Sequence, residues 1–325
     1  MDYKTLCKKI KQYKKIFNVK IIGKSIFKRK IFAVEKQVNP AFFTAVFLCS
    51  VHGRESIATD MVCKMIDDGI FNKIKDFNLS FILMANPDGV ELSNYGIKSA
   101  PVWARKELLE FNKNSTEFSL WKANGRGVDI NNNFDANWGT NVHSNEPASS
   151  GFDGNFAESE PETQALVRYT KKINPFITIS YHSKGEEIYY NFFQKERFLE
   201  RDKKIAERFA SSTGYVIKNP EKTSSGGYKD HCVMNLKIPA LTIELGSDNL
   251  THPIKLENLN EIYFRNKDVA KDLEFAYNVF VESKYGLSRE IYEKSDCTCK
   301  KSGTAWWGSG GCGYCFKWRN FSIGL

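Results

Sequence analysis

A histidine and a glutamate stand three residues apart in the segment Val51-His52-Gly53-Arg54-Glu55, directly after the apolar run from Phe42 to Cys49. A strand end followed by a helical turn can aim residues at this spacing toward one point. A neutral imidazole and a carboxylate that converge there are two of the three protein ligands of an open, catalytic zinc site. By itself the pair is weak evidence, because a solvated His–Glu pair arises often by chance.

Two further polar residues follow apolar runs elsewhere in the chain. His182 comes after Phe176–Tyr181, and Glu244 comes after Ile238–Ile243. Ligand sites of open α/β sheets lie at the carboxyl ends of strands, so we expect both residues to meet the first pair. Two histidines and one glutamate leave the fourth position of zinc to water, which the metal acidifies. Glu244 is then the candidate general base, and the alternative is a strand-end carboxylate that faces solvent.

The elements that must position these residues alternate between strands and helices. This alternation predicts an α/β fold with helices on both faces of a sheet. Asn86-Pro87-Asp88-Gly89 is predicted to be a turn, and residues 135–160 a long loop. The strand-like stretches are residues 19–22, 31–34, 42–51, 79–84, 176–181 and 238–243. The helix-like stretches are residues 3–17, 56–70, a helix that opens at Ser159-Glu160-Pro161-Glu162, and 257–284.

The composition is that of an ordinary globular protein, with 42% hydrophobic and 26% charged residues in 325. No run of eighteen apolar residues appears, so we expect no membrane span. The N-terminus has no apolar signal-like region, and we therefore expect a cytoplasmic location. No linker divides residues 1–285, which we predict to be one domain, with residues 286–325 as a short tail. The sequence does not indicate an oligomeric state.

The positive charge is concentrated at the N-terminus. Residues 1–37 hold eleven lysines and one arginine against two acidic residues, a net charge of +10, whereas the whole chain carries +9. A basic segment of this kind favours an anionic partner, or it is simply the solvated face of the helix over residues 3–17. No aromatic stacking pattern accompanies the charge, so we do not expect nucleic-acid binding.

The order of the candidate ligands resembles the zinc carboxypeptidase family. Its pattern is His-x-x-Glu, a second histidine more than a hundred residues later, and a catalytic glutamate near the end of the domain. The resemblance spans about residues 5–280 and implies a mixed, twisted sheet, one catalytic Zn²⁺ and a peptide substrate. Arg54 also matches, as do Gly127-Val128-Asp129-Ile130-Asn131 and Ser225-Gly226-Gly227-Tyr228-Lys229-Asp230.

Within this family the chain looks most like bacterial γ-D-glutamyl-L-diamino acid endopeptidases, which act on peptidoglycan stem peptides. Residues 119–124, 181–189 and 227–230 carry that likeness. The family's Asn-Arg pair, whose arginine binds the terminal carboxylate of the substrate, is Asn131-Asn132 here. Loss of a bidentate arginine removes selection for a free chain end, which favours an endopeptidase acting on a muropeptide. The alternatives are a carboxypeptidase acting on ordinary peptides and a non-catalytic wall-binding module.

The resemblance also assigns roles to the residues around the ligands. Lys229 aligns with the base of the S1′ pocket, where a lysine should favour an anionic P1′ group, unless it is a loop lysine that points to water. Lys122 follows Trp121 where the family has its oxyanion-binding arginine, with Arg126 as the second candidate. The predicted substrate-binding residues are Arg54, Asn131, Asn132, Tyr228, Lys229 and Asp230.

Four cysteines cluster in the tail. Cys297 and Cys299 precede Cys312 and Cys315 by twelve residues, a spacing that suits a small tetrahedral Cys₄ zinc site. A disulfide-linked tail and a disordered, glycine-rich tail are the alternatives. The sequence therefore predicts one catalytic zinc ion and a possible second, structural one.

Overall fold

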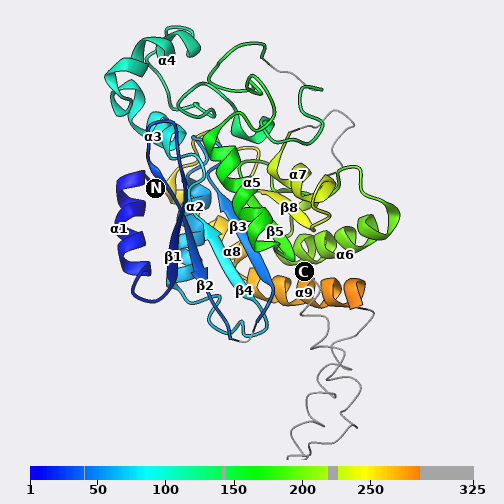
Figure 1. Cartoon of the computed structure of the whole chain (residues 1–325). Coiled ribbons are helices and arrows are strands. Elements are labelled where there is room, and N and C mark those ends of the chain that lie inside the picture. Colours follow the sequence, from blue (N-terminus) through cyan, green and yellow to red (C-terminus); the bar gives the residue numbers. More distant parts are fainter. Residues whose placement is uncertain (40, 141–143, 219–225, 286–325) are drawn as a thin grey trace, which may run out of the picture. The chain divides into compact units, whose positions relative to one another are not determined.

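The computed structural model describes residues 1–39, 41–140, 144–218 and 226–285 (Figure 1). The chain divides into two compact units, Met1–Phe275 and Ala276–Leu325. The predicted domain boundary after residue 285 stays a prediction. The four tail cysteines, and with them the predicted structural zinc site, lie outside the described residues.

One mixed sheet of eight strands forms within the described residues, in the order β1-β2-β4-β3-β5-β8-β6-β7. Strands β4, β3, β5 and β8 run parallel to one another. Strand β2 is antiparallel to both β1 and β4, and β6 is antiparallel to β8. This confirms the predicted α/β class. The strands are β1 (Asn18–Lys24), β2 (Lys30–Lys36), β3 (Thr44–Cys49), β4 (Asn78–Ile82), β5 (Ile177–His182), β6 (Glu187–Tyr189), β7 (Val216–Ile217) and β8 (Ala240–Glu244).

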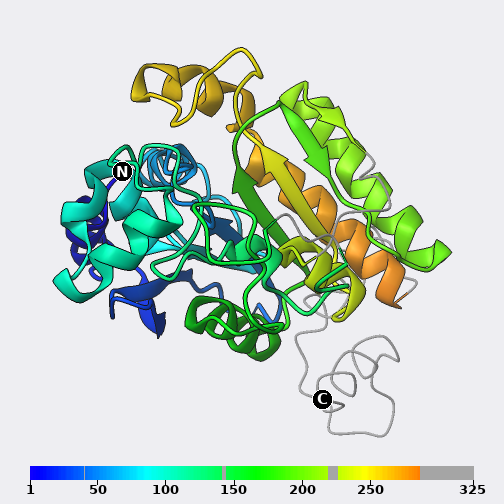
Figure 2. The same cartoon turned by 90° about the horizontal axis from the view of Figure 1, so that it is seen from above.

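Helices cover both faces of the sheet, as predicted. In Figure 1 helix α5 lies in front of the sheet and α2 behind it, and Figure 2 shows the two helices on opposite sides of the strands. The α-helices are α1 (Tyr3–Tyr13), α2 (Ile57–Asp67), α3 (Pro87–Tyr95), α4 (Arg105–Phe111), α5 (Pro161–Ile173), α6 (Glu196–Thr213), α7 (Tyr228–Met234), α8 (Leu259–Asn266) and α9 (Val269–Tyr285).

Strand β3 contributes to a hydrophobic core on each face because its side chains alternate. Val46 and Leu48 belong to a buried cluster that includes residues of α5 and α7. Phe47 points the other way and stacks on Phe81 and Tyr181, with ring centroids 5.1 and 6.2 Å apart. The continuous apolar run from Phe42 to Cys49 is what a strand buried on both faces requires.

Three predicted elements differ from the structure. Asn86-Pro87-Asp88-Gly89 starts helix α3 instead of forming a turn, because Asn86 accepts a hydrogen bond from the Gly89 amide as the N-cap and Pro87 suits the first helical position. The predicted helix 257–284 is interrupted between α8 and α9. The side-chain amide of Asn266, the last residue of α8, donates hydrogen bonds to the Tyr215 hydroxyl and to the Ile262 carbonyl. Such side-chain hydrogen bonds to the main chain compete with continuation of the helix.

The N-terminal helix ends earlier than predicted, at Tyr13 instead of residue 17. Its buried side chains, Leu6, Ile10 and Tyr13, follow the helical spacing that predicted it. In the part of the chain that the structure describes, no helix is both long and apolar enough to cross a membrane.

Strands β3, β5 and β8 are direct neighbours and parallel, so their carboxyl ends meet at one edge of the sheet. The register places Cys49 beside Tyr181, and His182 beside Glu244. The chain therefore reaches His52, His182 and Glu244 from three adjacent strand ends.

Candidate metal centre and active site

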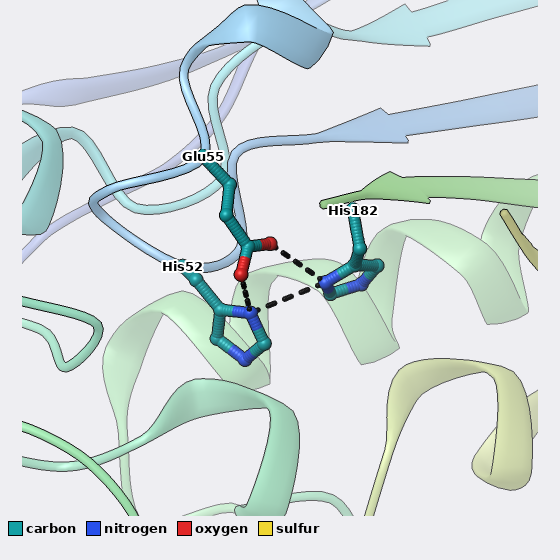
Figure 3. A group of neighbouring side chains, drawn as sticks. All are labelled: His52, Glu55 and His182. Carbon is teal, nitrogen blue, oxygen red and sulfur yellow. Dashed lines mark hydrogen bonds and ion pairs between the residues drawn. The ribbon is translucent and has the colours of Figure 1, made fainter. Parts of the chain in front are cut away.

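His52, Glu55 and His182 converge at this edge of the sheet, and all three are buried (Figure 3). The two carboxylate oxygens of Glu55 lie 2.8 Å from His52 Nδ1 and 3.1 Å from His182 Nδ1. The two Nδ1 atoms are 3.2 Å apart. Ligands about 2.1 Å from a tetrahedral zinc ion lie about 3.4 Å from one another. The donor types and their spacing therefore fit a zinc ion.

The turn between β3 and α2 aims the first two ligands. Ser50 has a φ of 51°, in the left-handed region that a serine seldom adopts, and its hydroxyl lies 2.7 Å from that of Thr59 on α2. The following turn is closed by a hydrogen bond from the Glu55 amide to the His52 carbonyl, 3.2 Å long. The predicted geometry, a strand end followed by one turn, is thus present.

Asp129 holds the other side of the His52 ring. Its Oδ1 lies 3.2 Å from His52 Nε2, and its Oδ2 accepts a hydrogen bond from the Gly151 amide. A carboxylate at Nε2 fixes the tautomer that leaves the Nδ1 lone pair for a metal. Asp129 lies within the motif Gly127–Asn131, and the sequence alone does not predict its role. The sequence signal that could have identified it is an acidic residue within a matched motif that is not itself one of the predicted metal ligands.

The charges of the pocket are strongly coupled. Burial alone would lower the pKa of His52, but the Glu55 and Asp129 carboxylates raise it to about 9. Burial would raise the pKa of Glu55, yet His52 and His182 hold it well below its usual value. The anionic side chains thus favour a cation between them, and metal binding releases the proton that otherwise fills this role.

Glu244 is half-buried at the end of β8, in register with His182 on the neighbouring strand. Burial and the Glu55 carboxylate raise its pKa to about 8, against the opposing charges of His52 and Lys122. A dication bound by Glu55 would oppose that increase. A carboxylate whose pKa lies near neutrality suits a group that must first take a proton and then return it.

The structure separates the two candidates for the oxyanion donor. Lys122 Nζ lies 3.6 Å from Asp129 Oδ2. Burial would lower its pKa, but Asp129 and Glu55 raise it, so the side chain is a cation beside the ligands. Arg126 is exposed, and its Nε lies 3.7 Å from Glu160 Oε2. Lys122 is therefore the better placed of the two.

Lys229 is buried in helix α7. Its Nζ donates to the Asn191 carbonyl over 2.9 Å, forms an ion pair with Asp230 and lies 5.3 Å from the centre of the Phe192 ring. The alternative of a loop lysine that points to water is wrong. The Asp230 carboxylate compensates the charge of Lys229. The sequence alone does not predict this ion pair.

The other predicted substrate residues lie in different surroundings. The Tyr228 side chain is fully buried, with its hydroxyl 2.8 Å from that of Thr170, so it packs in the core. Asn131 and Asn132 end a short 3₁₀ turn beside Asp129, and Asn131 Oδ1 accepts a hydrogen bond from the Tyr228 amide. Arg54 Nε is buried and has no hydrogen-bond partner among the described residues, which leaves a donor available next to the ligand Glu55.

The mixed sheet and the convergence of two histidines and a glutamate at its carboxyl edge define a zinc metallopeptidase. The chain belongs to the zinc carboxypeptidase family, whose model matches residues 3–264.

Individual relatives place the chain within this family. It is 29% identical over 233 residues to gamma-D-glutamyl-L-diamino acid endopeptidase 1 of Lysinibacillus sphaericus, a match that covers 67% of this chain and 57% of that protein. The chain thus spans less than two thirds of that relative's length.

Two solved structures show the same fold. Carboxypeptidase A from Helicoverpa armigera has a TM-score of 0.68 and 20% identity, over 87% of this chain and 74% of that one. Murein-tripeptide amidase MpaA from Escherichia coli O157 has a TM-score of 0.51 and 19% identity, over 79% of this chain and 91% of that one.

Proposed function

We propose that this peptidase hydrolyses an amide bond in peptidoglycan-derived peptides, namely the bond between γ-D-glutamate and diaminopimelate. The observation that carries the proposal is the buried group of His52, Glu55 and His182, with Glu244 in register beside it. The named activity of the Lysinibacillus sphaericus relative supports this choice of bond. Asn132 supports it as well, because it replaces the arginine with which the family selects a free chain terminus.

Each residue of the pocket has a distinct task in such a reaction. A bound zinc ion supplies Lewis acidity, which polarises the scissile carbonyl and acidifies water. Glu244 takes the proton of the attacking water and delivers it to the leaving amine. The Lys122 ammonium stabilises the negative charge that develops on the carbonyl oxygen. Asp129 keeps the His52 ring in place, and no covalent intermediate is required.

The pairing of Lys229 with Asp230 supports a diaminopimelate side chain at P1′. The distal end of that side chain carries both an ammonium and a carboxylate. A buried Lys–Asp pair offers a donor and an acceptor to such an end, whereas an uncharged P1′ side chain would leave the pair unused.

Glu244→Gln tests the proposed reaction. We expect wild-type protein to cleave a muropeptide digest at γ-D-Glu–diaminopimelate and the variant to be about 10²- to 10⁴-fold slower, since only the base is lost. Mass spectrometry identifies the products, and equal zinc content in both proteins is the control. Release of C-terminal residues alone would favour the carboxypeptidase alternative, and cleavage by neither protein would contradict a hydrolase.

Lys229→Glu tests the proposed specificity. It places two carboxylates side by side, so we expect kcat/KM to fall for diaminopimelate peptides and to change less for peptides with lysine in that position. The two peptides are compared on the same preparation of protein. Unchanged kcat/KM for the diaminopimelate peptide would remove Lys229 from substrate recognition.

A further inference from the structure

We propose that Asn86 is a positioning residue that holds the loop of the zinc ligands against the loop that carries Lys122. The proposal deepens the function proposed above, since it assumes that Lys122 must stand at a defined place beside the metal. The ligand pattern assigns no role to Asn86, whose side chain is fully buried.

The side-chain amide of Asn86 joins three segments of the chain. Its Nδ2 lies 3.0 Å from the carbonyl of Val51, 3.2 Å from that of Lys122 and 3.0 Å from that of Ala123. Its Oδ1 accepts from the Gly89 amide at 2.8 Å. The side chain is fully buried, so no water can replace it as a donor.

Main-chain bonds reinforce the same junction. The Asn86 amide donates to the Ser50 carbonyl over 3.0 Å, and the Gly53 amide donates to the Lys122 carbonyl over 3.0 Å. The Lys122 carbonyl thus accepts from the ligand loop and from Asn86 at once. Any shift of the Lys122 backbone relative to His52 must break one of these bonds.

The three segments cross in direct contact. A Cβ atom at Gly53 would lie 2.4 Å from the carbonyl of Gly89 and 2.8 Å from the Trp121 oxygen. A Cβ atom at Gly89 would lie 2.4 Å from the Ala123 oxygen. Only glycine fits at either position, and the buried carbonyls around the crossing need a donor from within the protein.

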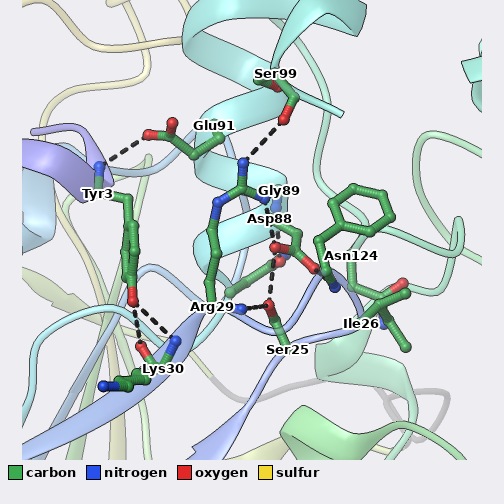
Figure 4. A network of polar contacts seen from close by, with 12 residues as sticks. Tyr3, Ser25, Ile26, Arg29, Lys30, Asp88, Gly89, Glu91, Ser99 and Asn124 are labelled. Atoms are coloured by element: carbon green, nitrogen blue, oxygen red, sulfur yellow. Dashed lines mark hydrogen bonds and ion pairs between the residues drawn. The ribbon is translucent and has the colours of Figure 1, made fainter. Parts of the chain in front are cut away.

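Each joined segment is also anchored elsewhere, which separates positioning from folding. Asp88, two residues after Asn86, accepts hydrogen bonds from Ser25 and from Arg29 of the β1–β2 hairpin (Figure 4). Asn124, two residues after Lys122, donates to Glu160 at 2.7 Å. Loss of the Asn86 donors should therefore leave the fold intact and free the Lys122 loop to move relative to the ligands.

Asn86→Ser is the sharpest test, because serine retains an N-cap acceptor for helix α3 but lacks the amide donors. We expect the variant to keep its full zinc content and its KM, but to lose about 10- to 100-fold in kcat, since small displacements at a catalytic group are costly. When Co²⁺ replaces the zinc ion, the visible spectrum of the variant should differ from that of the wild type.

Ser93→Ala is the matched control. Ser93 also lies on α3 and donates over 2.8 Å to the carbonyl of Ser119, three residues before Lys122, so its loss leaves the hydrogen bonds to the Val51, Lys122 and Ala123 carbonyls in place. Its loss should lower thermal stability with kcat and the Co²⁺ spectrum unchanged. If Asn86→Ser lost stability alone, as Ser93→Ala should, or failed to retain zinc, positioning by Asn86 would be refuted. If the wild type cleaved no muropeptide, the proposed function would fail, while the Co²⁺ spectrum would still decide the role of Asn86.

Discussion

The molecule contains two groups of buried acidic residues that are satisfied in opposite ways. In the metal pocket, the described side chains at hydrogen-bond distance from the Glu55 carboxylate are those of His52 and His182, which have lone pairs to offer a cation. In the second group, named here the acid cluster, Asp88, Glu160 and Glu162 are buried and surrounded by fixed donors. Figure 4 shows Asp88 with two of them, Ser25 and Arg29. Those donors are the side chains of Ser25, Arg29 and Asn124 and the main-chain amides of Ile26 and Phe27.

The electrostatic consequences are opposite as well. The pKa of Glu55 lies well below its usual value because of His52 and His182, although burial opposes this. Burial, Asp88 and Glu160 raise the pKa of Glu162 to about 8. Buried carboxylates alone therefore do not indicate a metal site. What distinguishes the pocket is that the Glu55 carboxylate lies against two imidazoles, which can exchange a proton for a metal ion.

Removal of the metal should have the largest effect in the pocket. We expect a chelator to abolish peptidase activity and zinc to restore it, whereas His182→Ala should neither bind zinc stoichiometrically nor recover. Zinc at about 1,000 times its dissociation constant should stabilise the wild type by about 4 kcal/mol, which thermal unfolding measures. If zinc did not change the melting temperature of the wild type, the proposed difference between the metal pocket and the acid cluster would be wrong.

Arg29→Met should affect the acid cluster and spare the pocket. Arg29 Nη1 lies 2.7 Å from the fully buried Asp88, so methionine keeps most of the volume and leaves a buried charge without its cation. We expect a loss of about 3 kcal/mol in the free energy of unfolding, measured in urea. The response of the variant to zinc should equal that of the wild type. A reduced zinc content would mean that the two groups are coupled.

The positions of the ligands could be predicted because they depend on the sheet. The apolar runs before His182 and Glu244 mark adjacent parallel strands, and such strands deliver their last residues to the same edge. The turn from His52 to Glu55 is local and follows from the chain itself.

The supporting residues could not be placed, because distant loops hold them. The main-chain amide of Lys122 donates a hydrogen bond to the Ser149 carbonyl, and the Gly151 amide donates one to the Asp129 carboxylate. Both partners lie in a segment whose sequence has no periodic hydrophobic pattern. Asn86 was assigned to a turn since asparagine and proline start turns and helices alike.

The smallest effect should come from Glu162→Gln, and it concerns pH. The pKa of Glu162 is raised from 4.5 to about 8 on folding, so the protonated form favours the folded state. Its contribution to stability is fully present below pH 4.5 and is lost as the pH rises through 8. Between pH 6 and pH 8 the wild type should lose on the order of 2 kcal/mol that the variant, which has no proton to lose, retains. The neighbouring Asp88, Glu160 and Arg29 are present in both proteins and cancel in the comparison.

Urea unfolding at several pH values measures this difference, with the exposed Glu107→Gln as the matched control that should follow the wild type. Zinc content and the response to a chelator should be the same in all three proteins, because the acid cluster has its own donors and holds no metal ligand. Parallel stability curves for wild type and Glu162→Gln would mean that Glu162 is ionised in the folded protein. The fixed donors of the acid cluster would then be strong enough to hold every carboxylate as an anion, and the contrast with the metal pocket would rest on donor geometry alone.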